Sequence, residues 1–240
     1  MMDELTPELN EVCYCGSGEK YKYCCEEKDR IPTADIRTIE FKVSDNSHIL
    51  LELGAPLSND DQEAFLAILD ILSLETPQVD EKLIMDLQIL AEKYHNPFVW
   101  ENLHTTYILS GNLRQALTIE NAIKTRFPNG FYTRFLKSAR ALEEKRLEDF
   151  EACFNHCANL PMLYPKRKVF HSSEAKMFHF QWLLYCTLIS DLRRAESHFI
   201  PLQALLDEDD PALAQAREFM KALRKQRKDI VLSNRQFHPG

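Results

Sequence analysis

Glycine is scarce in this sequence, and long apolar runs are missing. Only six glycines occur among 240 residues. Neither the G-x-x-x-x-G-K-[ST] phosphate-binding loop nor the G-x-G-x-x-G dinucleotide fingerprint occurs, which argues against a nucleotide-binding α/β fold. The longest apolar run, Phe180 to Ile189, covers about half of the roughly 18 residues that a membrane helix requires, and Gln181 interrupts it. The sequence therefore predicts a soluble protein that does not cross a membrane.

Signals for secretion and for catalysis are missing as well. Residues 1–5, Met-Met-Asp-Glu-Leu, contain no basic stretch followed by an apolar one, so no secretory signal is predicted and a cytoplasmic location is expected. Neither a G-x-S-x-G elbow nor an H-E-x-x-H pair occurs. We therefore expect a protein that is not an enzyme, with an unfamiliar active site near residues 170–200 as the alternative. The net charge of −8 also disfavours a general nucleic-acid coat.

Four of the seven cysteines lie within thirteen residues: Cys13, Cys15, Cys24 and Cys25. A C-x-C pair and an adjacent pair are separated by a loop long enough to bring all four sulfurs around one ion. Four thiolates in a tetrahedral shell suit Zn²⁺, and a filled shell makes a structural site rather than a catalytic one. The hydroxyl of Ser17 can donate a hydrogen bond to a thiolate. The alternatives are two disulfides in a secreted miniature domain, or plain buried thiols.

The pattern C-x-C-G-S-G-x-K-Y-K-x-C-C over residues 13–25 resembles the SEC-C motif, the short zinc-binding tail of the bacterial preprotein translocase motor SecA. This resemblance implies that the four cysteines are the zinc ligands. It also implies a recognition knob, which in the translocase contacts the export chaperone SecB and is linked to ribosomes, and it implies no reaction. Residues 1–30 contain four Lys/Arg and eight Asp/Glu, a net charge of −4, which favours a protein partner over RNA.

Beyond the motif, the sequence predicts four segments. Residues 1–30 form the zinc-binding module. Residues 31–57 form a linker and a β-hairpin, because apolar residues alternate between 35 and 53 around the polar stretch 44–47. Helical periodicity begins at Ser58 and continues to about residue 230, followed by a tail over 231–240. The fold class is therefore mainly α, with the helical segment as a scaffold.

One stretch of the helical segment resembles a tetratricopeptide repeat of about 34 residues. The resemblance implies paired helices, or hairpins, that stack into a solenoid. Weaker copies occur over residues 135–161 and around Trp182, Cys186 and residues 190–199, and a closing helix begins at residues 210–211 and runs to about residue 228. The alternative is an irregular helical bundle. The matching positions of the best copy are Trp100, Leu103, Tyr107, Gly111, Asn112, Ala116 and Pro128.

A solenoid of helical hairpins has a concave face, lined by the first helix of each hairpin, that holds extended peptides or partner helices. The repeat positions predict which side chains line this groove. The alternative is that most of these aromatic residues are core between repeats. The candidate groove residues are Phe98, Glu101, Thr105, Tyr132, Phe135, Met177 and Phe180.

The last predicted helix is basic in an otherwise acidic protein. Such a strip could bind an acidic partner, ribosomal RNA or an anionic surface. The alternative is a solvated end cap, because Lys and Arg are favoured near a helix C-terminus. The candidate basic patch consists of Lys221, Arg224, Lys225, Arg227 and Lys228.

Cys153 and Cys157 are four positions apart with His156 beside Cys157, which on one helix would place both thiols on the same face. We interpret them as small core residues rather than as a second metal site. Together these patterns predict a bacterial zinc-binding adaptor that binds other proteins, in protein quality control, export or translation. A ribosome-associated or nucleic-acid-associated factor that uses the basic helix is the alternative.

Overall fold

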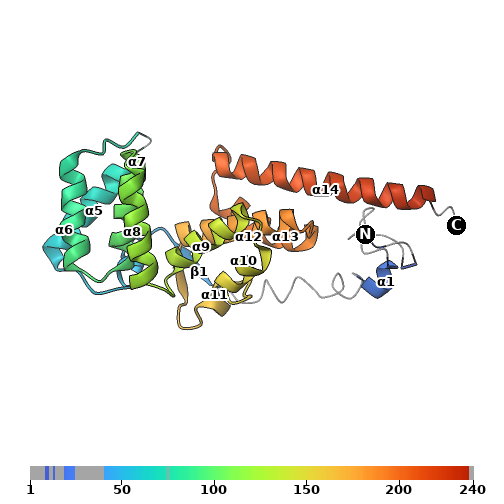
Figure 1. Cartoon of the computed structure of the whole chain (residues 1–240), viewed down its shortest axis with the longest axis horizontal. Coiled ribbons are helices and arrows are strands. Elements are labelled where there is room, and N and C mark those ends of the chain that lie inside the picture. Colours follow the sequence, from blue (N-terminus) through green and yellow to red (C-terminus); the bar gives the residue numbers. More distant parts are fainter. Residues whose placement is uncertain (1–8, 11–12, 14–18, 25–40, 75, 238–240) are drawn as a thin grey trace. The chain divides into compact units, whose positions relative to one another are not determined.

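The computed structural model describes residues 9–10, 13, 19–24, 41–74 and 76–237, and most of these residues are helical (Figure 1). The predicted mainly α fold is confirmed. The chain divides into two compact units. The α5–α8 unit comprises Val43–Lys137 and Val169–His171. The α10–α14 unit comprises Ser138–Lys168 and the residues from Ser172 onward, together with the described residues up to Lys42.

Helices of the α5–α8 unit begin at polar caps that the sequence supplies. The side chains of Ser58, Asp80 and Asn112 each accept a hydrogen bond from the backbone N–H three residues later, and Asn96 accepts from Phe98. Such caps satisfy donors that a helix leaves unpaired at its start. The unit contains α4 (His48–Leu51), α5 (Asn59–Leu72), α6 (Glu81–Lys93), α7 (Pro97–Leu109), α8 (Leu113–Arg126) and the start of α9 (Phe131–Glu143).

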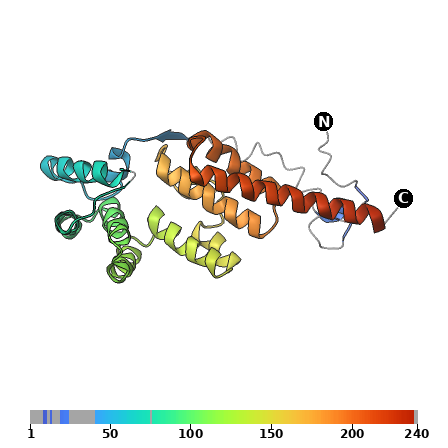
Figure 2. The same cartoon turned by 90° about the horizontal axis from the view of Figure 1, so that it is seen from above.

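A single apolar cluster joins these helices. Phe65 of α5, Leu87 of α6 and Val99 of α7 are fully buried in it. Ala116 and Ile123 contribute from α8. Because Ala116 carries only a methyl group, α8 can lie close against α7, and the two helices run side by side in both views (Figure 1 and Figure 2). The helical hairpin predicted for the stretch from Trp100 to Pro128 is confirmed as α7 and α8.

The predicted β-hairpin within residues 35–53 is wrong over its described part. Strand β1 (Lys42–Ser44) pairs with β2 (Val169–His171), far along the chain, rather than with residues 49–53. The polar stretch 44–47 starts a helix instead of a β-turn: the Asn46 side chain accepts from the N–H of His48 at 3.0 Å. Helix α4 follows and buries the consecutive residues Leu50 and Leu51. Residues 35–40 lie outside the described part.

The α10–α14 unit is built on an aromatic core. Phe150, Phe154, Phe178 and Trp182 are fully buried. The ring centroids of Phe150 and Trp182 are 5.1 Å apart, and those of Phe154 and Phe178 are 5.3 Å apart, both pairs edge to face. The unit contains α10 (Leu147–Cys153), α11 (Leu160–Leu163), α12 (Ser172–Leu188), α13 (Leu192–Leu205) and α14 (Pro211–Phe237), and its short N-terminal helix is α1 (Tyr21–Cys24).

Helix α14 lies along α12 and α13, as Figure 2 shows. The spacing of its buried residues, 213, 216, 220 and 223, places one apolar stripe toward these neighbours. It begins at Pro211 as predicted, but it runs to Phe237 rather than to about Lys228. In the part of the chain that the structure describes, none of the helices combines the length and hydropathy needed to cross a bilayer.

Three helix–helix turns share one geometry. At each turn a residue adopts a positive φ: Gly111 (75°), Lys145 (56°) and Ser190 (58°). The next backbone N–H then donates to the carbonyl five residues earlier, which is the Schellman arrangement that ends a helix. The three donor–acceptor pairs are Asn112 to Tyr107 at 2.9 Å, Arg146 to Ala141 at 2.8 Å and Asp191 to Cys186 at 2.9 Å. Turns of this geometry therefore end α7, α9 and α12.

The second helix of the middle hairpin is shorter than predicted. It ends at Cys153 rather than at Pro161, because Asn155 and His156 both have positive φ and break the helix. Pro161 lies inside the separate helix α11. Cys157 is consequently in the loop, where its Sγ lies 3.4 Å from the carbonyl of Asn155. The idea that Cys153 and Cys157 share one helix face is thus wrong.

Candidate metal centre and partner-binding faces

Two cysteines of the N-terminal motif come together around Tyr21. Cys13 is 1% exposed and Tyr21 is 5% exposed, and the half-buried Cys24 packs against them. The backbone N–H of Cys13 donates to the carbonyl of Glu19 at 2.7 Å, which places these two residues side by side. Helix α1 places Tyr21 and Cys24 three positions apart, on one face.

This arrangement fits half of a four-thiolate shell. One cysteine of the C-x-C pair and one of the adjacent pair meet in a buried cluster, as a site with ligands from both pairs requires. The other predicted ligands, Cys15 and Cys25, and the predicted hydrogen-bond donor Ser17 lie outside the described residues. Among the residues that the structure describes, three or more metal-binding side chains do not gather at any point.

The exposed side of α1 carries an aromatic ring. Tyr23 is 72% exposed, and the ammonium group of Lys22 lies 4.8 Å from the centre of its ring. The contact is a cation–π interaction that holds both side chains on the surface. An exposed tyrosine beside a lysine is a residue pair that protein partners recognise readily, because the ring offers apolar area and a hydroxyl.

The seven candidate groove residues are all half-buried, but their side chains make different contacts. Phe98 of α7 packs edge to face on Phe65 of α5, with ring centroids 5.5 Å apart. The ring centroids of Phe180 of α12 and Phe219 of α14 are 6.3 Å apart. Met177 lies one turn before Phe180 on α12. Phe98 and Phe180 therefore contribute to packing between helices of their own units.

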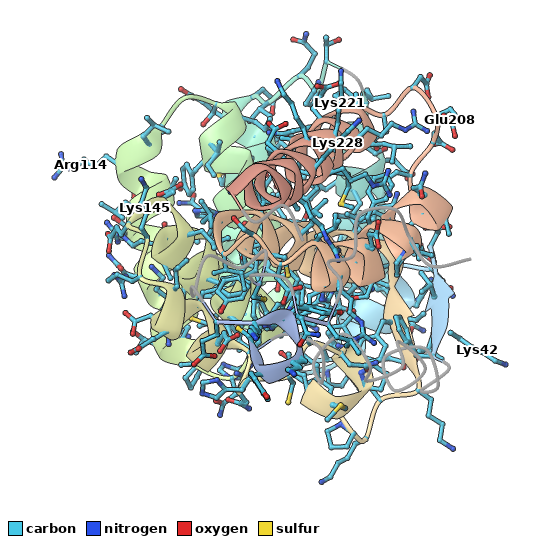
Figure 3. The ribbon with its side chains drawn as sticks, turned by 90° about the vertical axis from the view of Figure 1, so that its right-hand side faces the viewer. Lys42, Arg114, Lys145, Glu208, Lys221 and Lys228 are labelled. Carbon is cyan, nitrogen blue, oxygen red and sulfur yellow. The ribbon has the colours of Figure 1, made fainter. Side chains whose placement is uncertain are left out.

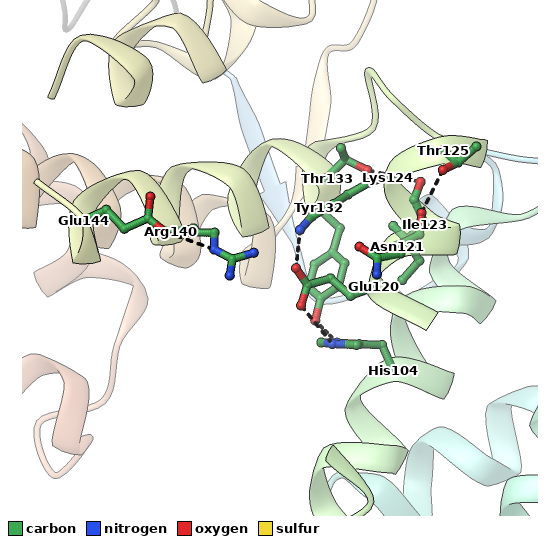
Figure 4. A network of polar contacts seen from close by, with 10 residues as sticks. All are labelled: His104, Glu120, Asn121, Ile123, Lys124, Thr125, Tyr132, Thr133, Arg140 and Glu144. Carbon is green, nitrogen blue, oxygen red and sulfur yellow. Dashed lines mark hydrogen bonds and ion pairs between the residues drawn. The ribbon is translucent and has the colours of Figure 1, made fainter. Parts of the chain in front are cut away.

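Tyr132 and its neighbours form the polar part of the candidate groove. Its hydroxyl lies 3.0 Å from Nδ1 of His104 (Figure 4). Its ring stacks on that of Phe135, with the ring centroids 5.9 Å apart. Burial, with a smaller contribution from Glu101, raises the pKa of Tyr132 to about 12, whereas a hydrogen bond with Thr105 lowers it slightly. Four predicted groove residues, Glu101, Thr105, Tyr132 and Phe135, are thus brought together on α7 and α9.

Sequence reasoning missed the histidine in this network. His104 Nε2 lies 4.0 Å from the Glu120 carboxylate, which also pairs with Lys124. Burial lowers the pKa of His104, and the nearby Glu120 opposes that shift. Its position four residues after Trp100, on the buried face of α7, is the only signal that the sequence holds. The network can orient Tyr132, but it includes no activated nucleophile.

The candidate basic patch lies on α14, where Arg227 continues the spacing of the apolar stripe and the other four residues lie beside it or away from it. Lys221, Arg224, Lys225 and Lys228 are exposed, and Arg227 is half-buried; Figure 3 labels Lys221 and Lys228. Some of this positive charge is already balanced. Arg224 pairs with Glu196 of α13 at 3.0 Å, and Lys221 lies 3.6 Å from Glu218.

A second polar cluster in the α10–α14 unit also escaped prediction. The Glu151 carboxylate accepts hydrogen bonds from Tyr185 at 2.8 Å and from Arg194 at 3.3 Å. The guanidinium of Arg194 lies 5.1 Å from the ring centre of Trp182. Burial alone would raise the pKa of Glu151, but these hydrogen bonds lower it overall. The partners are too far apart in sequence to form a recognisable motif.

Comparison with known proteins identifies the N-terminal motif. Residues 10–27 match the family model of the SEC-C motif, and this range contains all four predicted zinc ligands. Neither the curated proteins nor the solved structures contain a match to this chain.

Proposed function

We propose that this protein is a zinc-binding adaptor that joins a SEC-C module to a helical scaffold and binds other proteins. The observation that carries the proposal is the SEC-C motif at residues 10–27, whose described part buries Cys13 beside Cys24. Zinc, when bound, supplies a structural crosslink and no reaction. Cys13, Cys15, Cys24 and Cys25 would hold it, with Ser17 donating a hydrogen bond to a thiolate.

The chain's own residues supply the recognition surface of the module. Cys13 and Tyr21 form its buried side, and α1 leaves Tyr23 exposed on the outside with the half-buried Lys22 beside it. Fixing the cysteines fixes α1, and hence the orientation of Tyr23. A protein partner is favoured over RNA, because the segment is acidic and the bases Arg224 and Lys221 of α14 already have acidic neighbours.

The helical segment is proposed to act as a tetratricopeptide-like scaffold in the cytoplasm, with a role in protein quality control, export or translation. Its support is the shared geometry of the turns at Gly111, Lys145 and Ser190. The peptide or helix of a partner would lie against the face that carries Glu101, Thr105, Tyr132 and Phe135. Carboxylate and aromatic groups together favour a partner segment that contains a basic residue.

Metal content tests the first half of the proposal. The intact protein is expected to bind one zinc ion, and the double variant Cys24→Ser, Cys25→Ser is expected to lose it. The matched control is Cys153→Ser, Cys157→Ser, which removes two thiols outside the motif and should retain the ion. A zinc content near zero in the intact protein would contradict the proposal that the four cysteines bind zinc.

Partner capture from the native cytoplasm, followed by mass spectrometry, tests the second half. The motif variant should lose the partners that the control variant keeps. Glu101→Lys should weaken the capture of those partner proteins that bind the helical scaffold. Glu92→Lys, at an exposed position of α6, is the control and should leave their capture unchanged. Identical partner sets for all variants would contradict the adaptor function.

A further inference from the structure

Two buried histidines face one another between α12 and α13. The Nδ1 atoms of His179 and His198 are 3.0 Å apart. His179 is 7% exposed, and His198 is 0% exposed. At this distance one ring must donate a proton that the other accepts, so the contact requires one neutral acceptor nitrogen. The pair is therefore stable with both rings neutral.

The environment of the two histidine rings disfavours a protonated, charged imidazole. The His198 ring stacks on Trp182 at 5.5 Å with an angle of 9° between the rings, and Phe178 lies against both histidines. Within the described residues, Nε2 of His179 and Nε2 of His198 have no hydrogen-bond partner. A charged imidazole would thus lie in an aromatic core with its outer N–H unpaired, which is unfavourable.

Charged groups from the neighbouring elements do not relieve this penalty. On α13, Arg194 stacks over Trp182 and adds positive charge near His198. Two acids, Glu151 of α10 and Asp191 of the α12–α13 turn, lie 3.3 and 4.0 Å from Arg194 and balance the charge of that residue.

The groups on α14, α9 and α12 named below also provide no free negative charge to stabilise a protonated histidine. On α14, Arg224 pairs with Glu196 of α13. From α9, Ser138 contacts the neutral Gln181. On α12 itself, burial raises the pKa of Tyr185 to about 12 and raises the pKa of the Cys186 thiol far above its ordinary value, so both side chains stay uncharged at physiological pH.

The chain contains a hairpin of the same design without this pair. Counted from the positive-φ turn residues Gly111 and Ser190, His179 occupies the position of Trp100, eleven residues before the turn. His198 occupies the position of Ile119, eight residues after it. Apolar side chains therefore serve at these positions in α7–α8, and packing alone does not require histidine there.

We propose that the α12–α13 hairpin is a proton-sensitive element: uptake of a proton by the His179–His198 pair separates α13 from α12 and exposes the aromatic core around Trp182. The geometry makes the response local. In α7–α8 the buried His104 has the carboxylate of Glu120 4.0 Å away, which stabilises a charged ring. That hairpin should therefore stay closed over a range of pH in which α12–α13 opens.

The expected response follows from the direction of the shifts. Burial lowers the pKa of His179 from 6.5 to about 4, and burial lowers the pKa of His198 well below its ordinary value, with nearby positive charge adding to the effect. Each histidine thus favours the closed form above pH 6.5, and this contribution is lost as pH falls from 6.5 toward 4. At pH 5.5 one such group favours opening by about tenfold, and two by about a hundredfold.

Hydrogen exchange of the full chain, measured at pH 7.5 and 5.5 and corrected for the intrinsic chemical rate, tests the proposal. When the pH is lowered from 7.5 to 5.5, the equilibrium constant for opening should rise about a hundredfold in peptides from 172–205. In peptides from 97–126 it should rise much less. In His198→Ile, which copies the residue of the other hairpin, the rise should fall to about tenfold. His156→Gln, an exposed site, should behave as the wild type.

An equal response in both hairpins, or an unchanged response in His198→Ile, would overturn the proposal. If the variant does not fold, the wild type still decides the question through its imidazole ¹⁵N chemical shifts. Both rings should remain neutral at pH 5.5 in the folded protein. A midpoint near 6.5 for either ring, without loss of folded signal, would show that the pair accepts charge in place.

Discussion

The side-chain amide of Asn96 donates a hydrogen bond to the backbone carbonyl of Leu51 at 2.8 Å, across 45 residues of sequence. The same amide reaches the carbonyl of Ala55 at 3.2 Å, while the Asn96 oxygen accepts from the N–H of Phe98. Asn96 is fully buried. A single side chain thus caps α7 and fixes α4 and the following loop against it.

Replacing Gly54 by alanine should disrupt this contact. An added Cβ would lie 2.6 Å from Cα of Asn96 and 2.7 Å from Cδ of Pro97, and both atoms belong to the rigid start of α7. Overpacking of this kind costs typically about 1–3 kcal/mol, and we expect the upper part of that range for the free energy of unfolding. Urea denaturation of wild type and variant measures the difference.

Gly111→Ala is the control for that experiment. Gly111 also has a turn role, but an added Cβ would meet no atom within 4 Å, so only its φ of 75° is unfavourable for alanine. The expected loss is about 1 kcal/mol. If Gly54→Ala lowers the free energy of unfolding no more than Gly111→Ala does, the loop around residue 54 must shift to accommodate the added Cβ.

Ser190→Gly should stabilise the protein. Ser190 has a φ of 58° at the end of α12, and glycine adopts this conformation without steric cost. We expect a gain of about 0.5–1 kcal/mol in the free energy of unfolding. Ser110→Gly, at a φ of −77°, is the matched control and should give no gain. Equal effects of the two changes would contradict the assignment.

Removal of zinc should affect the motif and spare the helices. A chelator is expected to abolish hydrogen-exchange protection in peptides covering residues 9–24, because the cysteines lose their shared ligand. Far-UV circular dichroism should change little, because α1 is only four residues long. Loss of most of the helical signal would show instead that the motif is needed for the fold of the rest.

Asp61→Asn should weaken the α5–α6 contact in a pH-dependent way. Hydrogen bonds from Lys93 and Ser58 hold the pKa of Asp61 well below its usual range. Its contribution is therefore present above the ordinary carboxyl pKa and is lost as pH falls through the lower folded value. The urea midpoints of variant and wild type should differ most at pH 7, and the difference should narrow steadily as pH falls below the ordinary carboxyl pKa of 3.8. A difference that is independent of pH would point to packing.

Local patterns predicted the helices well. Ser58, Gly111 and Pro211 mark helix boundaries through short-range chemistry, namely capping, positive φ and the fixed φ of proline, and the structure confirms each of them. The β-hairpin prediction failed because the alternation over 49–53 includes three consecutive apolar residues, which also suit one buried helical turn. The actual partner of β1, Val169–His171, gives no local signal.

The candidate sites divide in the same way. The cysteine motif was predictable because its ligands are close in sequence and chemically distinctive. The His179–His198 pair and the contact between Glu151 and Arg194 were not, since each joins different helices and involves residue types that are common on any helix. Predicting them requires knowing which helix faces meet.

The pairing of β1 with β2 has a consequence for synthesis on the ribosome. Strand β2, residues 169–171, is made after all the helices of the α5–α8 unit and after the start of the other unit. Until it emerges, β1 has an unpaired edge, and such edges favour association with other chains. The β1–β2 pair can therefore form only late in translation, and polypeptides that stop before residue 169 could not form it.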